Sequence, residues 1–138
     1  MAVSLDRRAI LIGALVSTAI VLPGAFLNDA VKPDDHEDPS AAVYVAYLLI
    51  LGGFFLGGYV AGRLQPNPPM IHGAVAAALA YLALQGIFLV RRLVADESVA
   101  VLGILFLTLL VASCGMGGGL LASWRHSRRI DRTSEEPA

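Results

Sequence analysis

Four long apolar segments occupy most of this 138-residue chain, and none of them contains an Asp, Glu, Lys or Arg. They extend over residues 9–27, 41–62, 70–90 and 99–124. A helix rises about 1.5 Å per residue, so about 20 residues cross the roughly 30 Å hydrocarbon core of a bilayer. A lipid-exposed backbone must also satisfy its own hydrogen bonds, which a helix does. The sequence therefore predicts an all-α membrane protein with four transmembrane helices, arranged as two tandem helical hairpins and packed as a bundle.

The composition leaves no room for a soluble domain. Charged residues make up 15% of the chain, against about 25% in ordinary soluble proteins. Residues 1–124 are expected to form the transmembrane domain, and residues 125–138 a basic and then acidic tail. The pair Pro23-Gly24 lies near the end of the first segment, where it predicts either a kink or an early helix stop.

Basic residues near the predicted helix ends are distributed unequally between the two sides of the membrane, which predicts the orientation of the chain. One side has Lys32, Arg91 and Arg92, and the other has Arg7, Arg8, Arg63, Arg125, Arg128, Arg129 and Arg132. The positive-inside rule then puts both termini of this multi-pass membrane protein in the cytoplasm. The acidic connection 28–40 faces outward and is interpreted as a hydrated connector, with a weak divalent-cation site as the alternative.

Small residues recur every four positions in the second and fourth segments. Such stripes let helix backbones approach closely, and dispersion then replaces the hydrophobic force that lipid cannot supply. Packing within the chain, between copies or with a partner would all use them. The predicted packing residues are Gly53, Gly57, Gly58, Ala61, Gly62, Gly73, Cys114, Gly115, Gly118, Gly119 and Ala122.

The segments also resemble each other in pairs. Residues 10–15 align with 70–75 at an offset of 60, and residues 57–62 align with 118–123 at an offset of 61. A duplicated hairpin would give parallel repeats, related by an axis along the membrane normal. Chance similarity in a Gly- and Ala-rich composition is the alternative.

Few polar groups lie within or beside the segments. His72, Gln85 and Arg63 are the candidate functional polar residues, although a satisfied interfacial histidine and a structural glutamine are the simpler interpretations. With one cysteine and no second histidine at helix depth, the sequence predicts neither a metal site nor a cofactor. A stripe of arginines after Trp124 is predicted to contact anionic lipid headgroups, and the alternative is that these arginines are the ordinary basic residues at the cytoplasmic end of a transmembrane helix. The stripe consists of Arg125, Arg128, Arg129 and Arg132.

A family resemblance rests on three stretches. Residues 52–63 have the sequence GGFFLGGYVAGR, residues 71–74 have IHGA, and a Gly-rich last segment contains Gly115, Gly117, Gly118 and Gly119. These stretches resemble the YrzE-like group of small four-helix bacterial membrane proteins. The resemblance implies four helices in a bacterial plasma membrane and supplies no activity.

Two functions are compatible with these features. The first is a non-catalytic helix-packing module that acts as a homo-oligomer or as an accessory subunit of a membrane assembly. The second is a small uncoupled channel or transporter, which the absence of a polar row across the spans disfavours. An enzyme is not expected, because no nucleophile and base fall within reach of a common site. The expected partners are the lipid bilayer and other membrane subunits or a second copy, and no nucleic acid.

Overall fold

The computed structural model describes residues 5–31, 40–65, 67–94 and 101–134, and for residues 88, 91–94 and 129–134 it describes the backbone alone. This part of the chain forms α1 (Arg7–Ala30), α2 (Ala41–Leu64), α3 (Pro69–Val94) and α4 (Val101–Ser134). All four helices are long and apolar enough to cross a membrane. The predicted all-α, four-span membrane fold is therefore confirmed.

Local chemistry explains where the helices begin. Asp6 caps α1, because its carboxylate accepts hydrogen bonds from the backbone N–H of Arg8 at 2.8 Å and of Ala9 at 3.4 Å. These N–H groups would otherwise lack partners in the first turn of the helix. Pro69 is the first residue of α3, a position where the missing N–H of proline removes no helical hydrogen bond.

Helix α1 continues through Pro23 to Ala30, so an early helix stop at this proline is wrong. Contacts beyond the proline hold the helix against α2, since a Cβ atom on Gly24 would lie 3.1 Å from Cγ1 of Ile50. The membrane favours the same outcome, because lipid offers no water to satisfy a broken helical backbone.

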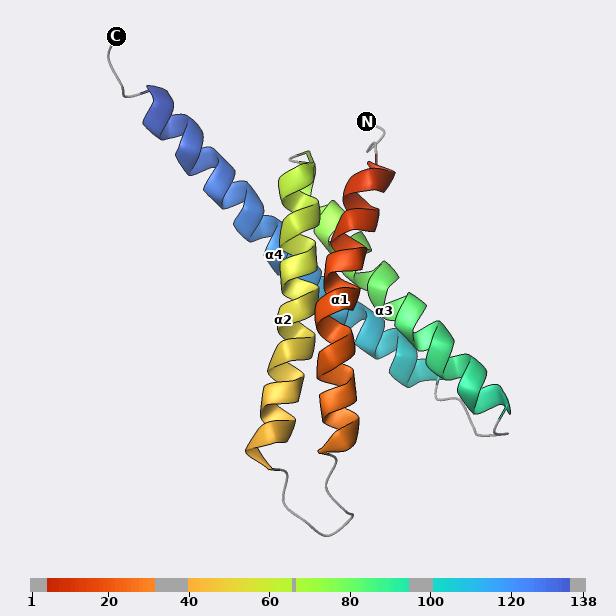
Figure 1. Cartoon of the computed structure of the whole chain (residues 1–138). Helices are drawn as coiled ribbons and strands as arrows, with labels where there is room; N and C mark the ends of the chain where they lie inside the picture. Colours follow the sequence, from red (N-terminus) through yellow and green to blue (C-terminus); the bar gives the residue numbers. More distant parts are fainter. Residues whose placement is uncertain (1–4, 32–39, 66, 95–100, 135–138) are drawn as a thin grey trace.

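Helix α4 continues past Trp124 to Ser134. The first part of the predicted tail is thus an extension of the last transmembrane helix. Beyond the apolar segment the helical hydrogen bonds persist in polar sequence, which hydropathy alone does not detect. Figure 1 shows this extension projecting past the ends of the other helices.

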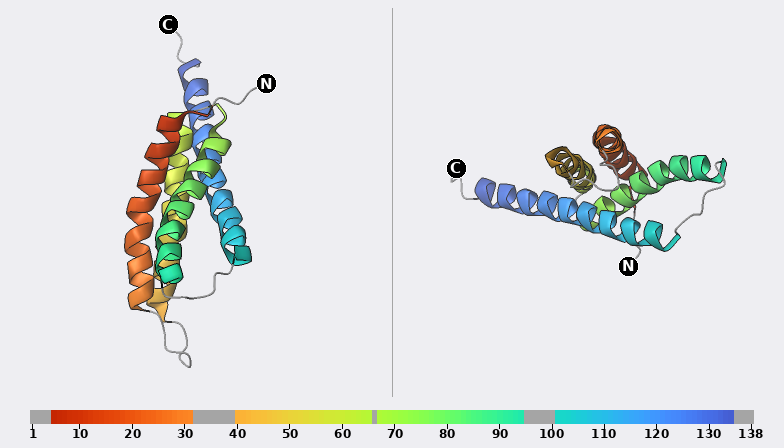
Figure 2. Two further views of the ribbon diagram at one scale, coloured as in Figure 1. Left: turned by 90° about the vertical axis from the view of Figure 1, so that its right-hand side faces the viewer. Right: turned by 90° about the horizontal axis from the view of Figure 1, so that it is seen from below.

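The helices form a flattened ring in the order α1, α2, α4, α3, and α2 also touches α3 across the middle. Among the described residues, α1 and α4 make no contact. α1 and α2 run antiparallel and side by side, whereas α3 and α4 cross them obliquely (Figure 1). The views in Figure 2 show that α4 diverges from α1 and α2 toward its first residue.

α1 and α3 begin, and α2 and α4 end, on the same side of the bundle (Figure 1). We call this side the basic end. The described arginines there are Arg7, Arg8, Arg63, Arg125 and Arg128.

The core consists largely of small side chains around one large ring. Phe54 is 1% exposed and packs among alanines that include Ala14, Ala77 and Ala80. Its ring meets Tyr81 edge to face, with ring centroids 6.3 Å apart. Close backbone approach, which small residues permit, is the main source of stability between helices in lipid.

Candidate functional site: glycine seams and the basic end

The first seam joins α1 to α2. Gly57 lies directly against Ser17 and the carbonyl oxygen of Gly13, where even a methyl group would collide with both. One turn further along α2, Ala61 is fully buried, and its Cβ atom would lie 2.7 Å from a Cβ atom on Gly13. One turn before Gly57, Gly53 contacts Val21 and Ile20 of α1. The predicted stripe at positions 53, 57 and 61 of α2 therefore faces α1.

The adjoining stripe of α2 faces α4. A Cβ atom on Gly58 would lie 2.6 Å from the Cα atom of Gly115, and one on Gly62 would lie 2.8 Å from the Cα atom of Gly119. Gly73 of α3 reaches the same place, where its Cα faces the carbonyl oxygen of Gly115. Gly58, Gly73 and Gly115 thus form a contact of three helices, which we call the three-glycine junction.

The remaining predicted packing residues of α4 also lie at helix contacts. Gly118 meets the backbone of α2 at the carbonyl of Phe55 and the N–H of Tyr59. Cys114 is partly buried against the core around Phe54, and Ala122 is buried at the basic end. All of the predicted packing residues therefore lie against another helix of the same chain.

The register of the two hairpins differs by about one turn. In the first hairpin Gly13 opposes Gly57. At the offsets of 60 and 61, their counterparts are Gly73 and Gly118. Gly73 instead opposes Gly115. The internal duplication stays a prediction, and the packing of the two copies is not equivalent.

His72 is fully buried and links two helix starts. Its Nδ1 lies 2.8 Å from the carbonyl oxygen of Pro68, and its Nε2 accepts the backbone N–H of Asp6 at 3.0 Å. Because a carbonyl only accepts, Nδ1 carries the proton, and Nε2 must then be the lone-pair acceptor. This geometry describes a neutral imidazole that connects the N-cap of α1 to the turn before α3. The sequence predicted a satisfied histidine and missed its partner Asp6.

Two arginines of the predicted headgroup stripe lie over aromatic rings. Arg125 donates to the hydroxyl of Tyr59 at 3.4 Å and lies 5.8 Å from the centre of that ring. The Arg128 guanidinium lies 3.6 Å from the centre of the Trp124 ring, a distance typical of a cation–π contact. The side chains of Arg129 and Arg132 lie outside the described residues.

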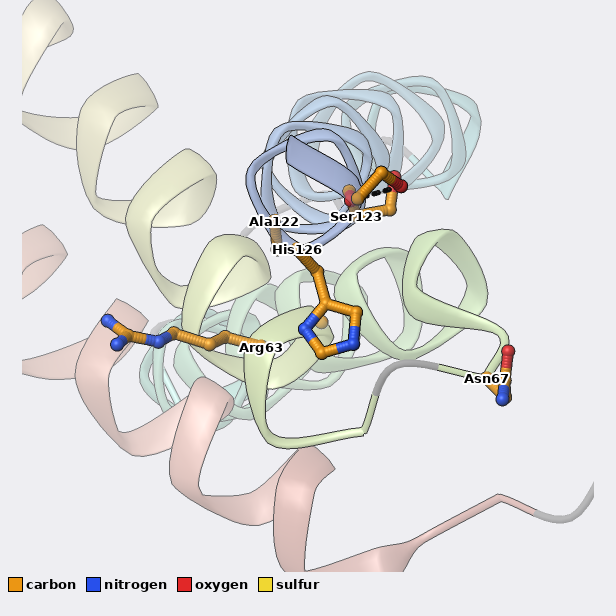
Figure 3. A pocket seen from close by; sticks show the side chains of 7 residues that line it. Arg63, Asn67, Ala122, Ser123 and His126 are labelled. Carbon is orange, nitrogen blue, oxygen red and sulfur yellow. Dashed lines mark hydrogen bonds between the residues drawn. The ribbon is translucent and has the colours of Figure 1, made fainter. Parts of the chain in front are cut away.

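A polar pocket of about 250 Å³ lies between the end of α2, the connection to α3 and the last turns of α4. Its polar lining residues are Arg63, Asn67, Ser123, His126 and Ser127, and Gly62 and Ala122 complete it. Figure 3 shows the imidazole of His126 projecting from α4 between Arg63 and Asn67, with the guanidinium of Arg63 extending away toward α1. Of the predicted functional residues, the structure brings Arg63 to this pocket and places Gln85 elsewhere, partly exposed on α3.

Two polar groups that are not among the predicted site residues also lie inside the bundle. Among the described residues, the buried hydroxyls of Ser17 and Tyr81 have no hydrogen-bond partner. A tyrosine in the middle of an apolar segment was the available signal for the second of these. Where side chains are described, no group of three or more His, Cys, Asp and Glu residues is arranged to hold a metal ion. Residues 34, 35, 37 and 38 of the acidic connection lie outside that part.

The fold defines a multi-pass integral membrane protein with four spans. No family model matches the chain, and no curated protein or solved structure is detectably similar to it. The YrzE-like group therefore stays a prediction from the sequence motifs.

Proposed function

We propose that this chain is a non-catalytic membrane module that associates with a second copy of itself or with a larger membrane assembly. The first half of α4 carries this proposal. Leu102 is 80% exposed, and Leu105, Phe106 and Leu109 are exposed as well, whereas Val111 is the first buried residue of the helix. This part of α4 has large apolar side chains on several faces and diverges from the other helices (Figure 2).

The glycine seams indicate that association would use a different surface of the bundle. The described small-residue stripes are filled by other helices of the chain, so association does not require them. Two exposed leucines of α4, Leu105 and Leu109, share one face at a spacing of four residues. A second helix packed on this face gains dispersion contacts that the first half of α4 lacks within one chain. The proposed association surface is therefore the face of α4 around Leu105 and Leu109.

Cross-linking in native membranes tests this proposal. A cysteine at Leu105 or Leu109, in a Cys114→Ser background, should be joined by a short bis-maleimide into a species of defined higher mass. Twice the chain mass indicates a homo-oligomer, and a discrete heavier species indicates an accessory subunit. The matched control is a cysteine at Leu15 of α1, which is 69% exposed and should give little product. Equal yields from α1 and α4, or monomer alone from both, would contradict the proposed surface.

We also propose that the basic end faces the cytoplasm of a bacterial cell. Arginines are concentrated there, and the positive-inside rule assigns such an end to the cytoplasm. Single cysteines at Ser40 and Ser98 should react with an impermeant thiol reagent in intact cells, and a cysteine at Ser134 should react only after lysis. The Cys114→Ser protein is the control for background labelling. Labelling of Ser134→Cys in intact cells, without labelling at the other two positions, would reverse the orientation.

A further inference from the structure

The pocket at the basic end has the character of an anion site. Its described lining residues are either uncharged or basic, with one imidazole, one amide and two hydroxyls, and with Arg63 at the wall, whose guanidinium extends away toward α1 (Figure 3). Gly62 and Ala122 are both buried, and their small side chains leave the recess between α2 and α4 unfilled. At about 250 Å³ it is smaller than the pockets that hold drug-sized ligands. Its size and polarity suit a single compact acidic group.

The surrounding charges favour the same class of ligand. The described side chains of the basic end include Arg7, Arg8 and Arg125 in addition to Arg63 of the pocket. Asp6 is the one described carboxylate on this side, and one of its two oxygens, Oδ1, accepts two hydrogen bonds from the first turn of α1. A net positive surface at the membrane boundary attracts anionic lipid headgroups.

One hydroxyl of the pocket, that of Ser127, is available to a ligand, whereas the hydroxyl of Ser123 donates to the carbonyl oxygen of Leu120 at 2.7 Å. Ser127 donates to the backbone oxygen of Ser123 at 3.3 Å, which is longer than a typical O–H···O hydrogen bond. Rotation about one side-chain torsion turns this hydroxyl from the helix toward a ligand oxygen. Arg63 is exposed and begins at the pocket wall (Figure 3), so its flexible side chain can turn to meet an anion.

An apolar track leads from the membrane to the pocket. On α4, Met116, Leu120, Ser123 and Ser127 follow one another at spacings of four, three and four residues, so they share one face of the helix. Met116 and Leu120 are exposed to lipid, at 40% and 52% respectively, and the two serines line the pocket. The face changes from apolar to polar next to Trp124, an aromatic residue of the kind that marks the membrane boundary.

We propose that this pocket binds the phosphate group of an anionic phospholipid, with an acyl chain lying along Met116 and Leu120. The phosphate oxygens accept hydrogen bonds from Arg63, Ser127 and a ring N–H of His126. A free phosphate ion would use the same donors, but it would leave the apolar track empty. Lipid binding at this site requires no second copy of the chain.

Native mass spectrometry of the full chain in a non-ionic detergent tests the site. We expect one phosphatidylglycerol per chain to bind about fivefold more tightly than phosphatidylcholine. The reason is that the basic residues around the pocket attract the net negative charge of phosphatidylglycerol, whereas phosphatidylcholine has no net charge. Ser127→Phe fills the pocket without changing charge and should weaken phosphatidylglycerol binding about tenfold. The matched control is Ser113→Phe, the same substitution at an exposed serine of α4 outside the pocket, which should change affinity less than about twofold.

A second pair of variants separates the pocket from general surface charge. Arg63→Gln should weaken phosphatidylglycerol binding more than Arg128→Gln. Both variants remove one positive charge, but the guanidinium of Arg128 lies over the ring of Trp124 and is not part of the pocket lining. Equal losses from both arginine variants, or unchanged binding in Ser127→Phe, would overturn the site. Millimolar inorganic phosphate should not displace phosphatidylglycerol. Complete displacement by phosphate, without any preference for lipid, would assign the pocket to a free anion instead.

Discussion

Replacing Gly58 by alanine is expected to lower the free energy of unfolding by about 1–3 kcal/mol or more, the usual effect of forcing a methyl group into a packed interior. The added Cβ atom would lie 2.6 Å from Cα and 2.8 Å from the carbonyl carbon of Gly115. Both are backbone atoms, so no side chain can turn aside. Relief requires α2 and α4 to separate, which also removes contacts of Gly73 in the three-glycine junction. The midpoint of thermal unfolding in mild detergent measures the effect.

Gly52→Ala is the matched control for this prediction. Gly52 lies on the same helix, and a Cβ atom there would have nothing within 4 Å. Alanine also has a higher helix propensity than glycine, by up to about 1 kcal/mol. Gly52→Ala should therefore leave stability unchanged or raise it. If Gly58→Ala and Gly52→Ala behave alike, the two helices do not approach each other as closely as the structure has them.

His72→Leu is expected to destabilise the protein by about 1–3 kcal/mol, because it removes two hydrogen bonds, to Asp6 and to Pro68, that each contribute about 0.5–1.5 kcal/mol. Leucine fills a similar volume but cannot accept the N–H of Asp6, which His72 accepts at 3.0 Å. The first turn of α1 should loosen as well, because Asp6 is its N-cap. Thermal unfolding measures the total loss, and faster hydrogen exchange in the first turn of α1 locates it.

His126→Leu is the control at the same end of the bundle. His126 is exposed, so this substitution should change thermal stability by less than about 0.5 kcal/mol. A His72→Leu protein as stable as the parent chain would show that the link between α1 and α3 contributes nothing. A loss of stability without faster exchange in the first turn of α1 would assign the effect to packing around His72 instead.

The small-residue stripes illustrate how far the sequence could predict the contacts. A spacing of four residues establishes that Gly53, Gly57 and Ala61 share one face, and that Gly58 and Gly62 share the next. It does not establish which helix covers each face, because any close-packed helix satisfies the same pattern. Only the assembled bundle shows that the first stripe faces α1 and the second faces α4.

The geometry of the candidate site depends even more on contacts between residues that are far apart in the sequence. His72 and Asp6 are 66 residues apart in the chain, and no local pattern connects them. The pocket likewise combines Arg63 of α2 with His126 of α4, and His126 resembled an ordinary polar residue of a tail. The apolar content ends at Trp124, whereas the helix continues through the first part of the predicted tail to Ser134.

The sequence by itself determined that this chain has four spans, because the length and polarity of a segment decide whether it can enter lipid, and both are local properties. It also determined which residues are small enough for close packing. The tertiary structure decided which stripes meet, how α4 diverges and where the polar pocket lies. These depend on the mutual fit of whole helix surfaces, and in lipid that fit is governed by dispersion at close range rather than by hydrophobicity, which sequence composition measures.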